Sequence, residues 1–358
     1  MAGNGAACAA PAGAVHVLGG ATMGTLWQAS VVAAAGADGH ALHDGIQACL
    51  DRVVAQMSTW EHGSDISRYN RAPAGTWQAL PQPFFDVLRE ALAIAADTGG
   101  AVDPTIGPLV EAWGFGPGGQ GGRPPDPDAR ADARARVGWT RVELDQAAQR
   151  ALQPGGVGLD LSGIAKGHGV DAVVQWLRAR GVSAALVEVG GELRGYGRKP
   201  DGSAWRVLAE AWPEDADGDA GATDEDGAQA AAADAGTGTG TGIGTVEDAA
   251  GPCIVVLDDA AIATSGDHWH CFEHGGRRYS HTIDPRSGAP VDHAPGAVTV
   301  VADSALQADA WATALTVLGP IDGLALAQAR GIAARWVTRG AGGERAHASD
   351  AFLQRLAP

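Results

Sequence analysis

Residues 167–198 read GHGVDAVVQWLRARGVSAALVEVGGELRGYGR, and this stretch decides the fold class. Its first half, GHGVDAVVQWLRARG, has apolar residues at helical spacing and predicts a helix. Its second half contains AALVEVGG and ELRGYGR, which predict a pair of β-strands joined through Gly190-Gly191. Helices and strands are mixed without the regular spacing of βαβ units, so we predict an α+β fold.

The rest of the chain continues this mixture. Further helices are predicted at residues 41–57, 81–100, 305–319 and 321–331. Further strands are predicted at residues 25–34, 141–145, 157–162, 253–259, 277–283, 297–302 and 333–338. Ser304-Ala-Leu-Gln307 is a capping-box pattern, which places the start of the helix at residue 305.

Composition excludes some classes of function. The chain has 358 residues, of which 45% are apolar, and its net charge is −17. Binding to nucleic acid depends on clustered Lys and Arg, so this charge argues against a nucleic-acid partner. The four cysteines contain no CxxC pair, so the sequence indicates neither a zinc site nor a disulfide framework.

Residues 213–251 differ in composition from the rest of the chain. They contain many acids, no Lys or Arg, and a Gly-Thr repeat. Such a segment buries too little apolar surface to offset its chain entropy, so we predict a disordered acidic insertion between two strands of one domain. Residues 1–18 are predicted to be a flexible tail, and residues 19–358 to form one domain that the insertion interrupts.

The N-terminus has neither the basic region nor the apolar region of a signal peptide. We also expect no segment long and apolar enough to span a bilayer. The chain as written is therefore expected to be cytoplasmic. A periplasmic or membrane-anchored location is the alternative if an N-terminal signal is missing.

Asp309 and Thr313 lie four residues apart, on one face of the helix predicted after Ser304. A carboxylate and a hydroxyl together offer hard oxygen ligands to Mg²⁺. The alternative is a solvated aspartate and a threonine that faces its own helix. Spacing alone favours the alternative.

Residues 159–169, LDLSGIAKGHG, form a candidate phosphate-binding turn. Glycines allow close approach of the backbone, the start of the following helix attracts anions, and Lys166 adds a positive charge. The segment matches neither the P-loop nor the dinucleotide fingerprint. A purely structural turn is the alternative.

Three further stretches contain candidate ligand contacts. Asp103 stands before a proline in GGAVDPTIGPLVEAWGFG, where glycines around two aromatic residues would let a loop wrap a flat ring. Met23, in GGATMGT, could lie on an aromatic ring, or the stretch could be an ordinary turn into the first strand. Trp60, in MSTW, could be a stacking platform or plain packing.

Taken in order, these stretches resemble the ApbE-type flavin transferases, the FAD:protein FMN transferases. The resemblance rests on ATMGT, MSTW with SDISRYN, VDPTIGPLVEAWGFGP, DLSGIAKGHGVD, LVEVGGELRGYG with KPDGSAWRV, ATSGD, YSHTIDPRSG and ADAWATAL. It runs from about residue 19 to beyond residue 318 and is interrupted only by the acidic segment.

The resemblance implies a Mg²⁺-dependent enzyme whose substrate is FAD. Such an enzyme transfers FMN to a Thr or Ser hydroxyl of an acceptor protein and releases AMP. In the family the acceptors are flavin-carrying subunits of redox complexes.

The resemblance also implies roles for individual residues. The residues it suggests as FAD contacts are Met23, Trp60, Ala101, Val102, Asp103 and Ile283. Ser162, Gly163 and Lys166 look like the pyrophosphate and metal side of the site. The carbonyl near Gly163 and the side chains of Asp309 and Thr313 look like Mg²⁺ ligands.

Phosphoryl transfer needs charge neutralisation and positioning more than covalent help, although the acceptor hydroxyl benefits from a base. His281 in YSHTIDPRSG is our candidate for that base, because histidine titrates near the working pH. Asp284 would orient His281 or its loop. The alternative is a hydrogen-bonded histidine at the end of a strand and an ordinary Asp-Pro turn.

Two other functions remain open on the sequence alone. An FAD pyrophosphatase would use the same site and metal, with water replacing the acceptor hydroxyl. A non-catalytic FAD-binding protein is the third possibility, although a pure binder has less need of metal ligands beside the pyrophosphate.

Overall fold

The computed structural model describes residues 13–34, 36–119, 121–209, 252–266, 271–292, 296–340 and 343–356. Its helices are α1 (Gly39–Met57), α2 (Asp65–Asn70), α3 (Gln82–Asp97), α4 (Gly107–Ala112), α5 (Pro127–Ala135), η1 (Trp139–Arg141), α6 (Ser162–Ala179), α7 (Ala305–Arg330) and α8 (Asp350–Leu353). Its strands are β1 (Ala14–Thr22), β2 (Thr25–Ala33), β3 (Thr76–Ala79), β4 (Leu144–Asp145), β5 (Arg150–Gln153), β6 (Ala184–Val189), β7 (Glu192–Tyr196), β8 (Trp205–Ala209), β9 (Cys253–Leu257), β10 (Ala260–Gly266), β11 (Cys271–His274), β12 (Arg277–Ser280), β13 (Ile283–Asp284), β14 (Ala289–Pro290), β15 (Ala297–Ala302), β16 (Ala333–Gly340) and β17 (Gly343–Ala348).

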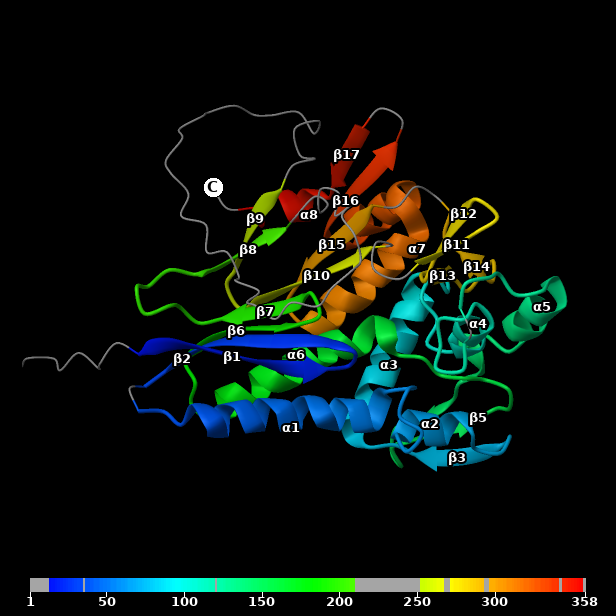
Figure 1. Cartoon of the computed structure of the whole chain (residues 1–358), viewed down its shortest axis with the longest axis horizontal. Helices are drawn as coiled ribbons and strands as arrows, with labels where there is room; N and C mark the ends of the chain where they lie inside the picture. Colours follow the sequence, from blue (N-terminus) through cyan, green and yellow to red (C-terminus); the bar gives the residue numbers. More distant parts are fainter. Residues whose placement is uncertain are drawn as a thin grey trace, which may run out of the picture.

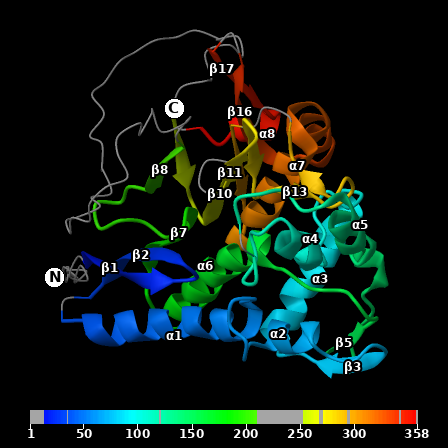
Figure 2. The same cartoon turned by 45° about the vertical axis from the view of Figure 1, so that its right-hand side comes forward.

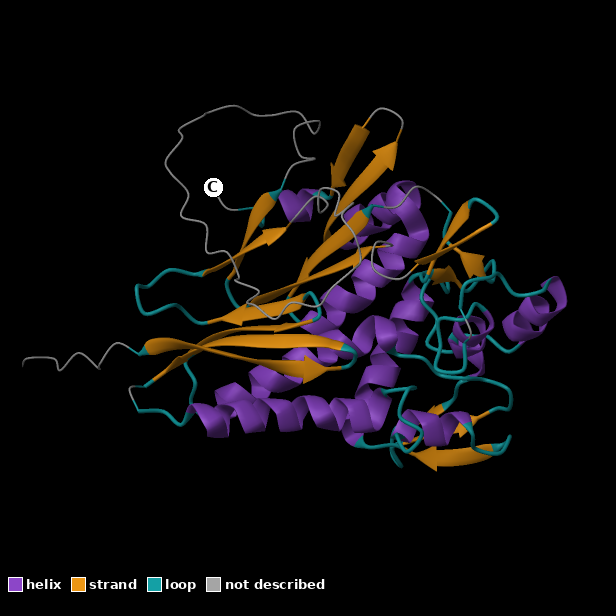
Figure 3. Cartoon of the chain, viewed as in Figure 1, coloured by secondary structure: helices purple, strands orange, loops and turns teal. Residues whose placement is uncertain are grey.

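An eight-stranded sheet with the order β1-β2-β6-β7-β10-β15-β16-β17 runs through the molecule (Figure 1). Every neighbouring pair in this sheet is antiparallel. Helices α1, α6 and α7 lie along the sheet, as the colouring by secondary structure also shows (Figure 3). The mixed order of helices and antiparallel strands confirms the predicted α+β class.

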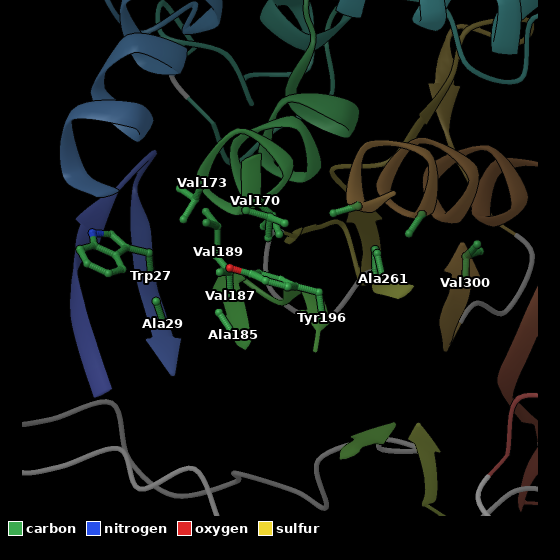
Figure 4. Packing of buried hydrophobic residues seen from close by; sticks show 14 of the residues in the cluster. Trp27, Ala29, Val170, Val173, Ala185, Val187, Val189, Tyr196, Ala261 and Val300 are labelled. Carbon is green, nitrogen blue, oxygen red and sulfur yellow. The ribbon is translucent and has the colours of Figure 1, made fainter. Parts of the chain in front are cut away.

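The main core lies between the sheet and these helices. Alternate residues of β2, including Trp27, Ala29 and Val31, point into it and are buried. Val170 and Val173 of α6 pack against them from the helix layer (Figure 4). Burial of each large apolar side chain contributes about 1.5–3 kcal/mol, so this layer fixes α6 against the sheet.

The opposite face of the sheet is covered by the β8–β9 hairpin. Trp205 of β8 and Leu257 of β9 pack on Ala184 of β6 and Ile262 of β10. Ala184 and Ala185 are neighbours in β6 but belong to these opposite cores, as strand alternation requires.

A third cluster supports the beginning of α6. Phe84 and Leu88 of α3 pack with Ile66 of α2 and with Ile164 and Ala165 of α6. In the view turned by 45°, α3 lies beside α6 and α7 (Figure 2). Two cores therefore hold α6, one at its N-terminal end and one along its length.

Most of the predicted elements are confirmed. The helices at residues 41–57 and 81–100 are α1 and α3, and the helix at 167–181 belongs to α6, which already begins at Ser162. The strand pair is the antiparallel pair β6–β7. Ser304 caps α7 as predicted, since its side chain accepts a hydrogen bond from the backbone nitrogen of Gln307.

The prediction of a strand at residues 157–162 is wrong. The backbone nitrogen of Leu159 donates to Asn70 Oδ1 at 2.7 Å, and Asn70 Nδ2 donates to the Leu159 carbonyl oxygen at 2.9 Å. A single parallel bridge, Ile106 to Gly158, is the strand-like pairing that remains in this part. The Asn70 side chain thus takes the place of a neighbouring strand.

Other boundaries also differ from the prediction, and the predicted strand at 141–145 is reduced to β4, which follows η1. The predicted strand at 277–283 is divided into β12 and β13, and His281 lies between them. The two predicted helices at 305–319 and 321–331 follow one another within α7, where Gly319 has φ 73° ahead of Pro320. A φ of this sign suits glycine and breaks the helical path.

The predicted tail at residues 1–18 is too long, because β1 begins at Ala14 and pairs with β2 along its whole length. Residues 1–12 and the predicted acidic insertion at 213–251 lie outside the described residues.

The expectation that no segment has the length and composition of a membrane span is wrong for α7. This helix is long and apolar enough by those two criteria, and half of its most apolar window is buried inside the protein. Its buried residues, such as Ala308 and Leu315, belong to the main core. A core helix of a soluble protein meets the same two criteria, so this is weak evidence for a membrane span.

Helices α6 and α7 approach so closely that one added methyl group is expected to destabilise the protein. A Cβ at Gly167 would lie 2.2 Å from the backbone carbonyl oxygen of Ala305. We expect Gly167→Ala to lower the free energy of unfolding by about 1–3 kcal/mol, because the two helices must move apart. Denaturant unfolding measures this loss.

Gly39→Ala is the matched control. Gly39 is the first residue of α1, and a Cβ there would meet no atom within 4 Å. This variant should be as stable as the wild type or slightly more stable. Equal stability of the two variants would contradict the α6–α7 contact.

Candidate functional site

Helices α6 and α7 meet through residues without bulky side chains. Asp309 Oδ2 accepts a hydrogen bond from the backbone nitrogen of Gly167 at 3.0 Å. One turn earlier in α6, a Cβ at Gly163 would lie 3.0 Å from Thr313 Oγ1. The structure therefore brings together the three residues that were predicted to bind a cation: Gly163, Asp309 and Thr313.

The backbone at Gly163 departs from helical geometry. Its φ is −85° and its ψ is 16°, inside the range assigned to α6. In a regular helix the backbone nitrogen of Gly167 would pair with the Gly163 carbonyl oxygen. Here that nitrogen donates to Asp309 Oδ2, and the distorted first turn of α6 lies beside α7.

Asp171 fixes the beginning of α7 to α6. Its two carboxylate oxygens accept hydrogen bonds from the backbone nitrogens of Ala305 and Leu306, both at 3.0 Å. Arg194 of β7 donates to Asp171 Oδ1 at 2.6 Å. Carboxylates stabilise helix N-termini, so Asp171 holds α7 in register with α6 and β7.

A buried group of charges lies beside this contact. Lys166 Nζ donates to Glu192 Oε1 at 2.7 Å and lies 3.5 Å from the Gly190 carbonyl oxygen. Glu192 is 2% exposed and Asp309 is 5% exposed. The two carboxylates are therefore nearly dry, whereas the Lys166 side chain is 33% exposed.

Burial and mutual charge shift the pKa values of this group. Burial raises the pKa of Glu192, the charge of Asp309 adds to the rise, and Lys166 opposes it. Burial also raises the pKa of Asp309, against the effects of Lys166 and the Gly167 N–H group. Burial alone would lower the pKa of Lys166, but the charges of Glu192 and Asp309 outweigh it and the pKa rises.

The donor set suits a hard divalent cation. A carboxylate, a hydroxyl and a backbone carbonyl offer oxygen, and Mg²⁺ is usually held by one or two carboxylates together with water and substrate phosphates. Glu192 Oε2 is buried without a hydrogen-bond partner among the described residues, which is a costly state unless a positive group joins it. No cluster of three His, Cys, Asp or Glu side chains suited to a metal occurs in the described part of the chain.

Ser162 begins α6 at the surface. Its backbone nitrogen and its hydroxyl both donate to Asp160 Oδ1, at 2.8 and 2.6 Å. Leu161 at the N-cap position provides no side-chain hydrogen bond, and the first turn carries no acidic residue. The Asp160 carboxylate therefore already binds the first backbone N–H group at this helix start.

Met23 and Trp60, two of the predicted FAD contacts, occupy different surroundings. Met23 lies in the β1–β2 turn with φ 50°, and its Cε lies 3.1 Å from the position of a Cβ on Gly169 of α6. Trp60 follows the end of α1, and 68% of it is exposed. A ring as exposed as that of Trp60 has a free surface for stacking.

The predicted contacts at residues 101–103 are largely engaged within the protein. Ala101 is 1% exposed, and Val102 is half-buried. Asp103 Oδ1 accepts from the backbone nitrogen and the hydroxyl of Thr105, and its Oδ2 accepts from the backbone nitrogen of Trp139. Burial raises the pKa of Asp103 despite these hydrogen bonds.

His281 lies in a separate part of the fold, between β12 and β13. Its ring stands edge-on to Phe115, with the ring centroids 6.4 Å apart. Asp284 accepts hydrogen bonds from the side chain of Arg286 at 2.9 and 3.0 Å and from its backbone nitrogen at 2.8 Å, so it orders the turn. Ile283 is 3% exposed and packs in the neighbouring core.

A hollow lies elsewhere in the protein. A cavity of about 530 Å³ is lined by residues that include Leu42, Trp176 and Arg180. Lys166 and Arg180 stand near opposite ends of α6, which separates them by about 20 Å at 1.5 Å per residue. This cavity shares no residue with the group around Asp309.

The start of α6 has the ammonium group of Lys166 beside it, and it faces hard oxygen donors on α7. This arrangement defines a candidate site for a phosphate-containing ligand with a divalent cation. The sequence model of the ApbE family matches residues 23–336. The chain therefore belongs to the ApbE family.

Known relatives cover nearly the whole chain. This chain is 33% identical to the FAD:protein FMN transferase of Klebsiella pneumoniae, over 96% of this chain and 90% of the relative. It is 34% identical to that of Vibrio cholerae, over 97% of this chain and 94% of the relative. The crystal structure of the Pseudomonas stutzeri flavinyl transferase ApbE, in its apo form, superimposes with a TM-score of 0.81 at 36% identity and covers 97% of this chain and 98% of that one.

Sequence reasoning missed two residues of the site, Glu192 and Asp171. Glu192 directly follows Gly190-Gly191 and opens a strand that is otherwise mostly apolar, which is an unusual place for a buried acid. Asp171 lies inside a helix, and its role depends on the N-terminus of another helix far away in the sequence. The position of Glu192 after two glycines was therefore a signal in the sequence, whereas no local pattern indicated the role of Asp171.

His168, next to this group, predicts a pH effect on stability. Burial lowers its pKa below the ordinary value of 6.5, against the opposite effects of Asp171 and Asp86. The folded protein thus binds fewer protons than the unfolded chain in mild acid, and stability falls as the pH drops below about 6.5. We expect His168→Gln to show a smaller loss of unfolding free energy than the wild type between about pH 7.5 and about pH 5.

Urea unfolding at the two pH values measures this difference. His62→Gln is the control, because His62 is exposed, and it should lose as much stability as the wild type. An undiminished loss in His168→Gln would show that the burial of His168 has no such effect.

Proposed function

We propose that this protein is an FAD:protein FMN transferase, which moves FMN from FAD to a Thr or Ser hydroxyl of an acceptor protein and releases AMP. The observation that carries the proposal is the meeting of α6 and α7, where Asp309 binds Gly167 and Thr313 lies against Gly163. Relatives that are named for this activity cover more than nine-tenths of the chain.

In this proposal Asp309, Thr313 and the Gly163 carbonyl oxygen hold Mg²⁺. The distortion at Gly163 and the donation from Gly167 to Asp309 support a role for that carbonyl outside the helix. When bound, the cation neutralises charge on the phosphates during transfer.

The chain's own groups hold the remaining parts of FAD. The start of α6 and Ser162 face the pyrophosphate, and Lys166 adds a positive charge that Glu192 keeps in place. Met23 and the exposed ring of Trp60 are proposed to contact the flavin or the adenine. Residues 101–103 are proposed to contact FAD through their backbone and their shape. The Asp103 carboxylate is not free to do so, because it already accepts hydrogen bonds from Thr105 and Trp139.

We propose that His281 accepts the proton of the acceptor hydroxyl. Its place between two short strands, against Phe115, gives it a fixed orientation at the rim of the aromatic cluster around α4. Asp284 keeps the following turn closed through Arg286, and Ile283 anchors the same strand in the core. The acceptor is proposed to be a flavin-carrying subunit of a redox complex.

The FAD pyrophosphatase and the FAD-binding protein remain the competing functions. Incubation with FAD, Mg²⁺ and an acceptor that carries an exposed Thr separates the three. Flavin fluorescence on the acceptor that survives denaturing electrophoresis supports the transferase. FMN and AMP without labelling would indicate hydrolysis, and neither signal would indicate binding alone.

Asp309→Ala should abolish Mg²⁺-dependent labelling of the acceptor. The substitution removes the buried carboxylate of the proposed cation site and leaves the apolar face of α7 unchanged. Thermal unfolding checks that the variant is folded. Asp44→Ala, which removes an aspartate with an 82% exposed side chain, should label at the wild-type rate, and full activity of Asp309→Ala would refute the metal assignment.

His281→Ala should still bind FAD but transfer FMN slowly, with a loss of about 10²- to 10⁴-fold if the histidine is the base. Fluorescence titration measures FAD affinity, and acceptor labelling measures the rate. His274→Ala changes an exposed histidine on the neighbouring hairpin and serves as the control. A wild-type rate in His281→Ala would remove this residue from the mechanism.

A further inference from the structure

Glu192 is a buried carboxylate with only one of its oxygens engaged. Its Oε1 accepts the hydrogen bond from Lys166 at 2.7 Å, whereas Oε2 is buried and has no partner among the residues that the structure describes. An unpaired carboxylate oxygen in a side chain that is 2% exposed carries a large desolvation cost. Burial raises the pKa of Glu192 to about 8, so the cost is removed either when Glu192 is protonated or when a positive group joins the ionised carboxylate.

The charges around Glu192 do not balance. Asp309 acts on Glu192 as a like charge, and Lys166 attracts both carboxylates. Arg194, on the same strand as Glu192, is bound to Asp171 at 2.6 Å and lies 3.8 Å from Asp259, so its charge is engaged by other carboxylates. If both carboxylates are ionised, Glu192, Asp309 and Lys166 together carry one net negative charge.

We propose that Glu192 and Lys166 form a charge pair that sets the cation affinity of the site at Asp309, with Glu192 as its second carboxylate. Glu192 attracts a divalent cation to the region between α6 and α7, directly or through a bound water molecule. The positive charge of Lys166 repels the cation and lowers its affinity. The ion pair with Glu192 reduces this repulsion. This inference rests on the proposed cation site, and Glu192 acts in it as a positioning residue.

The proposal predicts opposite effects of two substitutions that break the same ion pair. Glu192→Gln removes a negative charge and leaves Asp309 and Lys166, which cancel. Lys166→Met removes the positive charge and leaves two carboxylates. Coulomb energies between buried charges are large, so the first variant should bind Mg²⁺ more weakly and the second more tightly.

Calorimetric titration of Mg²⁺ into the full-length proteins, without FAD, tests this prediction. We expect Glu192→Gln to weaken Mg²⁺ binding about 10- to 100-fold. This is the usual loss of metal affinity when a group outside the first ligand shell is substituted. Lys166→Met should strengthen it. The double variant should return toward the wild-type affinity, because its net charge equals that of the wild type.

A purely structural ion pair would give a different result. Both single variants would then lose thermal stability, and their Mg²⁺ affinities would fall together or stay unchanged, which would overturn the proposal. Glu192→Asp keeps the charge and should keep most of the affinity, so it guards against misfolding of the glutamine variant. Glu61→Gln changes an exposed glutamate and should have no effect.

Asp309→Ala separates failure of this inference from failure of the proposed site. If Asp309→Ala removes Mg²⁺ binding and Glu192→Gln does not change it, the cation site stands and the role of Glu192 is refuted. If Asp309→Ala leaves Mg²⁺ binding intact, the site is elsewhere and both proposals fail.

Discussion

The hydrogen bond between the Gly167 backbone and Asp309 is the contact on which the site depends. It requires that α6 and α7 approach until a single methyl group would collide with the Ala305 carbonyl oxygen. The alanine-rich face of α7 and the glycines of α6 allow this distance, and Asp171 fixes the register from the other side. Side chains that are far apart in the sequence thereby become neighbours.

The same close packing explains the electrostatics. Water is excluded from Glu192 and Asp309, so their charges act through a medium of low polarity and the ammonium group of Lys166 has strong effects on both. The chain can hold Glu192 at this place because Gly190 and Gly191, with φ of 56° and 97°, turn β6 back into β7 directly before it. A residue with a side chain would be strained in both positions.

Local patterns in the sequence were sufficient for much of the fold and part of the site. Helical spacing placed Asp309 and Thr313 on one face, and the resemblance to the ApbE-type transferases added the carbonyl near Gly163. The structure brings these residues together as expected. Helix and strand periodicity likewise predicted α1, α3, α6 and the β6–β7 pair.

Other features depend on partners that no local pattern specifies. Asn70 replaces a strand beside Leu159, and Trp139 takes an oxygen of Asp103 that had been assigned to FAD. Both contacts join segments separated by tens of residues, and each uses a side chain where a periodic pattern would suggest another partner. Glu192 left a signal as an acid directly after Gly190-Gly191, but its contact with Lys166 became visible only in the structure.

The β8–β9 hairpin has a consequence for the architecture of the chain. Trp205 pairs with Leu257 and Ala209 with Cys253, so the two strand ends next to the intervening segment lie side by side, on the face of the sheet opposite α6 and α7. Lengthening a loop between closed ends costs only about 0.6 kcal/mol for each doubling. The hairpin is therefore a natural attachment point, where a folded module or a tag could be grafted while the helices that build the site keep their packing.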